Sequence, residues 1–120
     1  LLDTHIVLWW MDADPRIEPI RDVVLEASEV FVSAVTAWEV GIKVRRGALA
    51  LPRPLESDFA ANHFDTLDIR YAHAKLSTEL PLHHGDPFDR LLVAQSIVER
   101  LTLVTHDKAL LDYPCSTLKV

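Results

Sequence analysis

The sequence has few of the residues that mark secreted, membrane or disordered proteins. Cys115 is the only cysteine, so neither an internal disulfide nor a thiolate cage for a metal can form. Only three of the 120 residues are glycine and 49% are hydrophobic, which excludes a low-complexity or disordered chain. No apolar run approaches the roughly 18–20 residues of a membrane span, and nothing resembles a secretion leader. We therefore expect a soluble cytoplasmic protein that does not enter the membrane.

Positive charge is also scarce. The chain has 12 Lys and Arg against 18 Asp and Glu, a formal net charge of −6. This balance argues against a broad basic surface for nucleic acid. If the protein binds RNA or DNA, something else must neutralise the phosphates, and a divalent cation held by clustered acids would do so.

The length of 120 residues fits one domain with one region of buried core, so we expect a single domain over residues 1–120. The first residue is Leu1 rather than Met, and it resembles the end of a strand. One or more residues are therefore expected to precede it.

Strand and helix patterns alternate along the chain. Strands are predicted at 1–3, 30–32, 67–69, 103–105 and 117–120. Helices are predicted at 6–11, from Pro19 through the apolar positions Ile20, Val23, Val24 and Ala27, and at 33–46, 55–64, 71–80, 86–100 and 108–111. This alternation predicts an α/β fold, a three-layer α/β/α sandwich around a mainly parallel central sheet.

The helix predicted at 33–46 has clear end signals. Ser33 is a suitable N-cap, and Gly47 stops the helix. Val35, Trp38 and Ile42 recur at helical spacing and are predicted to form its buried stripe.

Two acids lie at the start of the helix predicted at 86–100. Asp86 is a good N-cap, Pro87 suits the first helical position, and Asp89 lies in the first turn, where the helix dipole favours a carboxylate. Asp86 either caps the helix only or joins Asp89 as an accessory acid.

Further acids follow strands of the predicted sheet. Asp3 ends the first strand, Glu39 lies in the helix after the second, and Asp107 follows the strand at 103–105. In a parallel sheet, ligands bind in the crevice beyond the carboxyl ends of the strands, so these acids and Asp89 are predicted to face one edge. Carboxylates that converge repel one another unless they are protonated, paired or hold cations. Oxygen ligands suit Mg²⁺ or Mn²⁺ rather than zinc, which predicts metal-assisted cleavage of a nucleic-acid backbone.

Other polar and aromatic residues have more ordinary interpretations. Histidines adjoin the acids without the spacing of a zinc site and are interpreted as loop residues, namely His5, His83, His84 and His106. Hydroxyls at the strand ends could orient a carboxylate or make a local hydrogen bond, namely those of Thr4 and Thr105. The basic trio of Lys43, Arg45 and Arg46 is interpreted as a solvated helix end. The tryptophans are assigned to the core or to a protein interface rather than to base stacking, namely Trp9, Trp10 and Trp38.

Four blocks, in this order, resemble the PIN-domain family, specifically VapC-type toxin ribonucleases of toxin-antitoxin pairs, and the resemblance covers nearly the whole chain. The blocks are Leu2-Asp3-Thr4-His5, Val32-Ser33-Ala34 through Trp38-Glu39, the run from His84 to Gln95, and Leu103-Val104-Thr105-His106-Asp107. The resemblance implies that Asp3, Glu39, Asp89 and Asp107 bind Mg²⁺ or Mn²⁺ and activate the attacking water. It also implies a homodimer, a VapB-like antitoxin and an RNA target such as tRNA or rRNA. The chain departs from the family pattern at two positions. Gly85 stands where many relatives have a basic or polar residue, and His106 stands where an arginine is frequent.

Two alternatives remain open from the residues alone. One is a Mg²⁺-dependent phosphatase with Asp3 as nucleophile, although the second Asp that such enzymes place two residues later is His5 here. The other is a catalytically silent binding module, against which the presence of all the acids argues.

Overall fold

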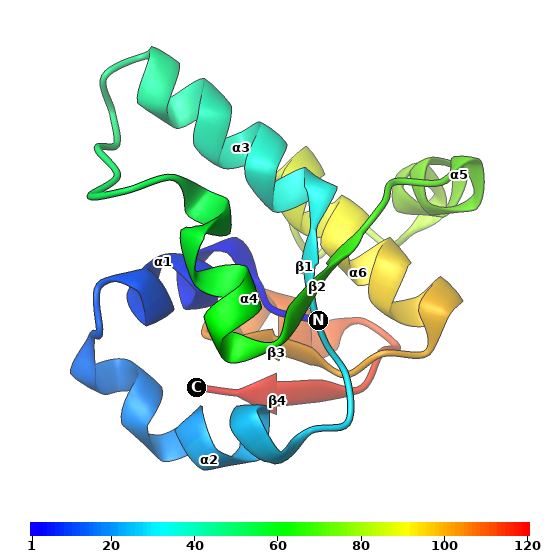
Figure 1. Ribbon diagram of the computed structural model, residues 1–120. Helices are drawn as coiled ribbons and strands as arrows, with labels where there is room; N and C mark the ends of the chain where they lie inside the picture. The colour runs from blue at the N-terminus through cyan, green and yellow to red at the C-terminus, as the bar shows by residue number, and fades with distance from the viewer.

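Short strands and helices alternate along the chain, of which the computed structural model describes residues 1–120 (Figure 1). The strands are β1 Val30–Ser33, β2 Phe64–Leu67, β3 Leu103–Thr105 and β4 Thr117–Lys119. The α-helices are α1 Thr4–Met11, α2 Glu18–Glu26, α3 Ala34–Arg45, α4 Phe59–Asn62, α5 Tyr71–Glu79 and α6 Pro87–Glu99. Short 3₁₀ helices are η1 Pro15–Ile17, η2 Leu55–Asp58 and η3 Lys108–Asp112.

The strands form a parallel sheet with the start of the chain at its centre. β1 pairs with β2, and β3 pairs with β4, both in parallel. Leu2 joins the two pairs through parallel bridges to Val32 and Val104. The order across the sheet is therefore β2, β1, the segment around Leu2, β3 and β4. The predicted parallel sheet is confirmed, although its first strand is reduced to a bridge at Leu2.

Helices cover both faces of the sheet, as predicted for a three-layer sandwich (Figure 1). One core packs α1, η1 and α2 against the sheet, and its fully buried side chains include Leu2, Ile6 and Ile17. The second core packs α3, α6 and η3 against the other face, around residues such as Leu92 and Leu103. Successive side chains of a strand point to opposite faces of the sheet, so Leu103 packs in the second core and Val104 in the first.

Two predicted elements near the middle of the chain are wrong in extent. His63 adopts a left-handed φ of 56° and ends α4, so the helix predicted at 55–64 stops before Phe64. Phe64 instead opens β2 and is buried in the first core. The strand predicted at 67–69 overlaps β2 only at Leu67, and Ile69 is exposed.

The buried face of α3 also differs from the prediction, although both ends are confirmed. Ser33 Oγ accepts a 3.0 Å hydrogen bond from the Val35 N–H, and Gly47 follows the helix at a φ of 74°. Trp38, predicted as buried, is 55% exposed, whereas Glu39 is 3% exposed. The buried side of α3 includes the polar residues Thr36 and Glu39. A prediction from hydrophobic residues alone cannot identify them.

Smaller differences concern the first two helices. α1 begins at Thr4, two residues earlier than predicted, because the chain turns directly after Asp3. On α2, Val23 is 56% exposed, and Ala27 lies beyond the last helical turn. None of the helices combines the length and the apolarity needed to cross a bilayer.

The topology brings one end of several elements to a single edge. The parallel strands end there, and Asp3, the start of α3 and Asp107 follow the segment at Leu2, β1 and β3 respectively. α6 precedes β3 and packs back along it, so the first turn of α6 lies at the end of β3. This edge is where the sequence predicts the functional site.

Candidate metal centre

Asp3 is buried at the end of the central segment. Its backbone N–H donates to the Val104 carbonyl oxygen at 3.0 Å, and the side chain is 2% exposed. Thr105 Oγ1 donates to Oδ2 of Asp3 at 2.6 Å, whereas Oδ1 is buried without a partner. Burial raises the pKa of Asp3; the Thr105 hydrogen bond and His5 oppose this rise, and the charge of Glu39 adds to it.

Glu39 enters the same site from α3. Its Oε2 accepts a 2.8 Å hydrogen bond from Lys43 Nζ one turn later, so this lysine neutralises the acid. Oε1 is buried and has no partner. Buried carboxylate oxygens almost always have a partner, so the unpaired oxygens of Asp3 and Glu39 are each free to accept a hydrogen bond or to bind a cation.

Asp86 and Asp89 begin α6. The predicted N-cap is confirmed, because Asp86 Oδ1 accepts hydrogen bonds from the N–H groups of Phe88 at 2.8 Å and Asp89 at 3.3 Å. Burial raises the pKa of Asp89 to about 7, with further contributions from the charges of Asp3, Asp86 and Glu39. Asp86 is thus both a cap and a contributor to the local negative charge.

His84 links Asp89 to Asp107. Its Nε2 lies 2.9 Å from Oδ2 of Asp107 and 3.1 Å from Oδ2 of Asp89. Its Nδ1 accepts a 2.9 Å hydrogen bond from the Asp86 N–H, which places the ring hydrogen on Nε2. One ligand atom from each of His84, Asp89 and Asp107 lies within 4.8 Å of the other two. The sequence interpretation treated His84 as a loop residue and missed this contact.

A buried arginine holds the loop that carries His84. Arg90 is 7% exposed, and its guanidinium donates to backbone carbonyl oxygens and to one phenol, namely those of Ser77, Leu80, Pro81, His84 and Tyr113. Three of these carbonyls come from the last turn of α5 and the residues just after it, where the helix dipole favours a cation. Sequence reasoning also missed this residue, although an arginine within an apolar helical run is itself a signal of a buried cation.

The structure brings the four predicted acids together, and with Asp86 they form what is called here the acid cluster. Electrostatic effects connect Asp89 with Asp3, Glu39 and Asp86, and His84 connects it with Asp107. Thr105 contributes twice, because its Oγ1 also accepts a hydrogen bond from the Asp107 N–H at 3.0 Å. The second predicted threonine, Thr4, instead shares a 3.2 Å hydrogen bond with Thr36.

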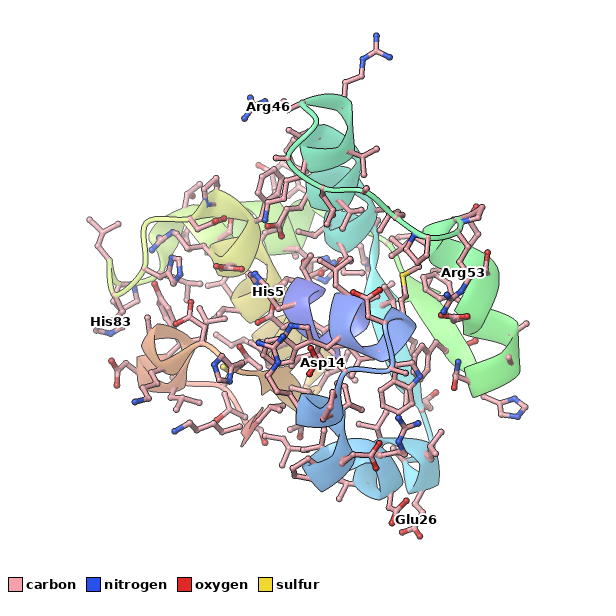
Figure 2. The ribbon with its side chains drawn as sticks, turned by 90° about the vertical axis from the view of Figure 1, so that its left-hand side faces the viewer. His5, Asp14, Glu26, Arg46, Arg53 and His83 are labelled. Atoms are coloured by element: carbon pink, nitrogen blue, oxygen red, sulfur yellow. The ribbon has the colours of Figure 1, made fainter.

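A cavity of about 440 Å³ adjoins two of these acids. It is lined by Asp3, His5, Trp9, His106, Asp107 and Lys108. Figure 2 looks at the molecule with His5 toward the middle of the visible face and His83 at its margin. Two of the histidines beside the acids thus share a cavity with Asp3 and Asp107, and His83 is exposed.

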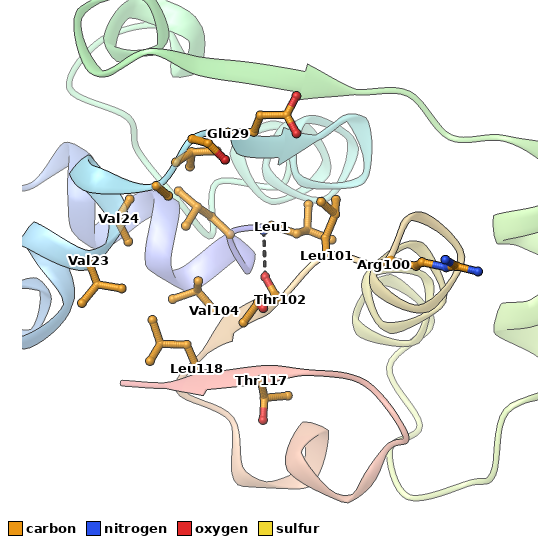
Figure 3. A pocket seen from close by; sticks show the side chains of 14 residues that line it. Leu1, Val23, Val24, Glu29, Arg100, Leu101, Thr102, Val104, Thr117 and Leu118 are labelled. Carbon is orange, nitrogen blue, oxygen red and sulfur yellow. Dashed lines mark hydrogen bonds between the residues drawn. The ribbon is translucent and has the colours of Figure 1, made fainter.

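A second cavity, of about 450 Å³, lies at the opposite edge of the sheet (Figure 3). Figure 3 shows side chains of α2 and β4 around Leu1, whose backbone nitrogen donates to the Thr102 carbonyl oxygen at 2.9 Å. No member of the acid cluster lines this cavity.

Comparisons with known proteins agree with this architecture. The sequence model of the family described as PIN domain matches residues 1–114, and the chain therefore belongs to the PIN-domain family. The chain is 32% identical to ribonuclease VapC22 of Mycobacterium tuberculosis over 114 residues, which are 92% of this chain and 88% of that relative. The predicted resemblance to VapC-type PIN domains is thereby confirmed.

Two solved structures share the fold. VapBC2 from Rickettsia felis, bound to a DNA fragment from its promoter, superposes with a TM-score of 0.72 at 16% identity, covering 98% of this chain and 96% of that one. A toxin-antitoxin complex from Klebsiella pneumoniae gives a TM-score of 0.70 at 18% identity, covering 98% of this chain and 94% of that one. At these identities the two structures support the α/β fold.

Proposed function

We propose that this protein is a Mg²⁺- or Mn²⁺-dependent endoribonuclease, the toxin of a toxin-antitoxin pair that acts in the cytoplasm. The observation that carries the proposal is the acid cluster with two buried, unpartnered carboxylate oxygens, Oδ1 of Asp3 and Oε1 of Glu39. Membership of the PIN-domain family and the similarity to ribonuclease VapC22 support the same conclusion.

The donor set fits a hard divalent cation. Asp3, Glu39, Asp89 and Asp107 supply only carboxylate oxygens, which Mg²⁺ and Mn²⁺ prefer. His84 is not expected to be a ligand through Nε2, because its Nδ1 already accepts a backbone hydrogen bond and a neutral ring has only one free lone pair. A bound divalent cation supplies positive charge to a phosphodiester oxygen and makes a nearby water more acidic.

The chain's own residues prepare the site for this chemistry. Thr105 holds one oxygen of Asp3, and Lys43 holds one oxygen of Glu39. The other oxygen of each acid has no partner and would be available to the cation. The His84 Nε2–H donates between Asp89 and Asp107 and orients both. Without a cation, burial and the charges of Asp3, Asp86 and Glu39 raise the pKa of Asp89 to about 7, so a bound cation would relieve an unfavourable charge at this carboxylate.

Partners follow from the relatives and from one exposed surface. The structural neighbours from Rickettsia felis and Klebsiella pneumoniae are toxin-antitoxin assemblies, and we propose a VapB-like antitoxin and a homodimer for this chain. Trp38, which is 55% exposed on α3 and lines a hollow with Ile42, supports a protein interface there. An RNA such as tRNA or rRNA is the proposed substrate.

The test is cleavage of purified tRNA and rRNA by the partner-free protein with Mg²⁺, with Mn²⁺ or with EDTA. We expect cleavage only with a divalent cation and a loss of at least about 100-fold in Asp89→Asn, because this change removes a carboxylate proposed to bind the cation. Lys75→Ala, on the exposed side of α5, is the matched control and should cleave normally. Cleavage that persists in EDTA or in Asp89→Asn would refute the proposal.

A further inference from the structure

The cavity beside Asp3 and Asp107, called here the Trp9 pocket, has a lining that the acid cluster does not explain. Besides the two acids it contains one apolar residue, Trp9, and three residues that carry nitrogen donors or acceptors, namely His5, His106 and Lys108. Its volume of about 440 Å³ falls within the usual range for small-ligand pockets. The sequence interpretation assigned Trp9 to the core or to a protein interface, but this tryptophan is only partly buried.

The Trp9 indole is held in place by a charged pair. The guanidinium carbon of Arg16 lies 3.9 Å from the ring centroid, within cation–π distance. Asp14 fixes this guanidinium by accepting hydrogen bonds from Nε at 2.9 Å and from Nη2 at 2.6 Å. Arg16 therefore covers one side of the Trp9 ring, and Asp14 orients the guanidinium.

His106 packs against Trp9 in the same pocket. Its ring meets Trp9 edge to face at 5.1 Å, and the His5 ring lies 6.4 Å from Trp9. The Nδ1–H of His106 donates to the Val120 carbonyl oxygen at 2.9 Å, which leaves Nε2 of the neutral ring as an unused acceptor. Lys108 supplies an exposed ammonium group at the start of η3.

An aromatic ring, a hydrogen-bond acceptor and a cation together suit a single nucleotide of an unpaired strand. Bases stack or pack against aromatic rings, and cations contact the phosphates. The net charge of the chain is −6, and Asp3 and Asp107 repel phosphate, so a local cation is needed where the strand passes the acids.

We infer that the Trp9 pocket binds the nucleotide of a single-stranded RNA that lies next to the cleaved phosphodiester. In this arrangement the base packs against Trp9 and His106, Nε2 of His106 accepts a hydrogen bond from a base N–H or a ribose hydroxyl, and Lys108 contacts the phosphate. The inference rests on the proposed nuclease function and adds to it the position and recognition of one flanking nucleotide.

The first experiment follows the tryptophan side chains by NMR. The Asp89→Asn protein, which is expected to be inactive, is labelled with ¹⁵N and titrated in Mg²⁺ with a 12-nucleotide single-stranded RNA of mixed sequence. The three indole N–H signals come from Trp9, Trp10 and Trp38, and Trp9→Phe assigns the first. We expect the Trp9 signal to shift while that of Trp38 stays in place, and RNA binding without a Trp9 shift would overturn the inference.

The second experiment measures the affinity of the same RNA by fluorescence anisotropy at several salt concentrations. Lys108→Ala should weaken binding and reduce the slope of log K against log[salt] by about 0.7, the value for one phosphate contact on a single strand. His106→Ala should weaken binding about 3- to 10-fold, whereas the control Lys75→Ala should change neither quantity. Equal affinities and slopes for Lys108→Ala and Lys75→Ala would overturn the inference.

The two proposals fail in different ways. If the wild-type protein cleaves RNA with Mg²⁺ but the Trp9 signal does not respond, the pocket assignment is wrong and the nuclease function stands. If the Trp9 signal responds and Lys108→Ala lowers the salt slope, but the wild-type protein does not cleave RNA, the pocket binds RNA without the proposed catalysis. If the Trp9 signal shifts with a purified protein partner and not with RNA, the pocket is a protein contact and the inference fails.

Discussion

Thr105 donates a 2.6 Å hydrogen bond to Oδ2 of Asp3, a residue 102 positions earlier in the chain. The same hydroxyl accepts from the Asp107 N–H, so one threonine at the end of β3 holds two parts of the acid cluster in register. Thr105, at the buried end of β3, is therefore part of the candidate metal centre.

Thr105→Val keeps the shape of the side chain and removes this hydroxyl. We expect Mn²⁺ affinity, measured by isothermal titration calorimetry, to fall by about 10- to 100-fold, as for other residues that orient metal-binding carboxylates. Thr105→Ser retains the hydroxyl and should bind Mn²⁺ within a few-fold of the wild type. Equal affinity for the valine and serine variants would show that the hydrogen bond is not needed.

Asp89 makes the metal-free protein sensitive to pH. The pKa of Asp89 is raised to about 7 in the folded protein, whereas an unfolded chain has a value of about 3.9. As the pH rises, the unfolded chain therefore loses this proton before the folded protein does. The contribution of Asp89 to the free energy of unfolding is complete below about pH 4 and is lost as the pH rises toward 7. Asp89→Asn should remove this dependence and raise the free energy of unfolding at pH 8 by at least about 1 kcal/mol.

Urea denaturation in EDTA at pH 5 and pH 8 measures this effect. Two results would show that Asp89 is not held in an unfavourable charged state. In one, the free energy of unfolding of Asp89→Asn changes between pH 5 and pH 8 as much as that of the wild type; in the other, Asp89→Asn is less stable than the wild type at pH 8. With Mn²⁺ present the trend should reverse, because protons and cations compete for the same carboxylate.

His84 should matter to cation binding although it is not expected to be a ligand. His84→Ala removes the N–H that lies between Asp89 and Asp107, and we expect Mn²⁺ affinity to fall by about 10-fold or more. His83→Ala changes the exposed neighbouring histidine and is the matched control. Tighter Mn²⁺ binding by His84→Ala would mean that the imidazole competes with the cation instead of orienting its ligands.

Arg90 is expected to act on stability first. Its guanidinium makes hydrogen bonds with groups from the end of α5, the following loop and Tyr113, and Arg90 itself is only 7% exposed. Arg90→Leu should lower the free energy of unfolding by about 3 kcal/mol, because several buried carbonyl groups lose a charged donor. Arg100→Ala, at the exposed end of α6, should change stability by less than about 0.5 kcal/mol in the same denaturation experiment.

Much of the fold could be predicted because local signals agree with the tertiary structure. Asp86 and Pro87 mark the start of α6, and Ser33 and Gly47 mark the ends of α3, through hydrogen bonds and backbone angles that depend on a few neighbouring residues. The strand at 67–69 failed because Phe64 was counted in a helix, and only the left-handed turn at His63 separates the two elements.

The site was predicted in part for a similar reason. Acids that follow parallel strands must meet at one edge, so Asp3 and Asp107 could be placed together from topology alone. His84 and Arg90 could not, because their roles depend on how the loop after α5 folds back on α6. The sequence interpretation placed Trp9 in the core or at a protein interface, and Trp9 does pack against the first core. Its contacts with Arg16 and His106 beside a cavity could not be predicted, because an aromatic residue in an apolar run gives no sign of them.

The central claim is that the acid cluster holds a divalent cation, and a crystal soaked in Mn²⁺ tests it most directly through the anomalous scattering of manganese. We predict a strong anomalous peak in contact with carboxylate oxygens of Asp3, Asp89 and Asp107, with Glu39 close by, and no such peak in an Asp89→Asn crystal. A wild-type crystal with no peak at this edge of the sheet, or with manganese bound only elsewhere, would contradict the account.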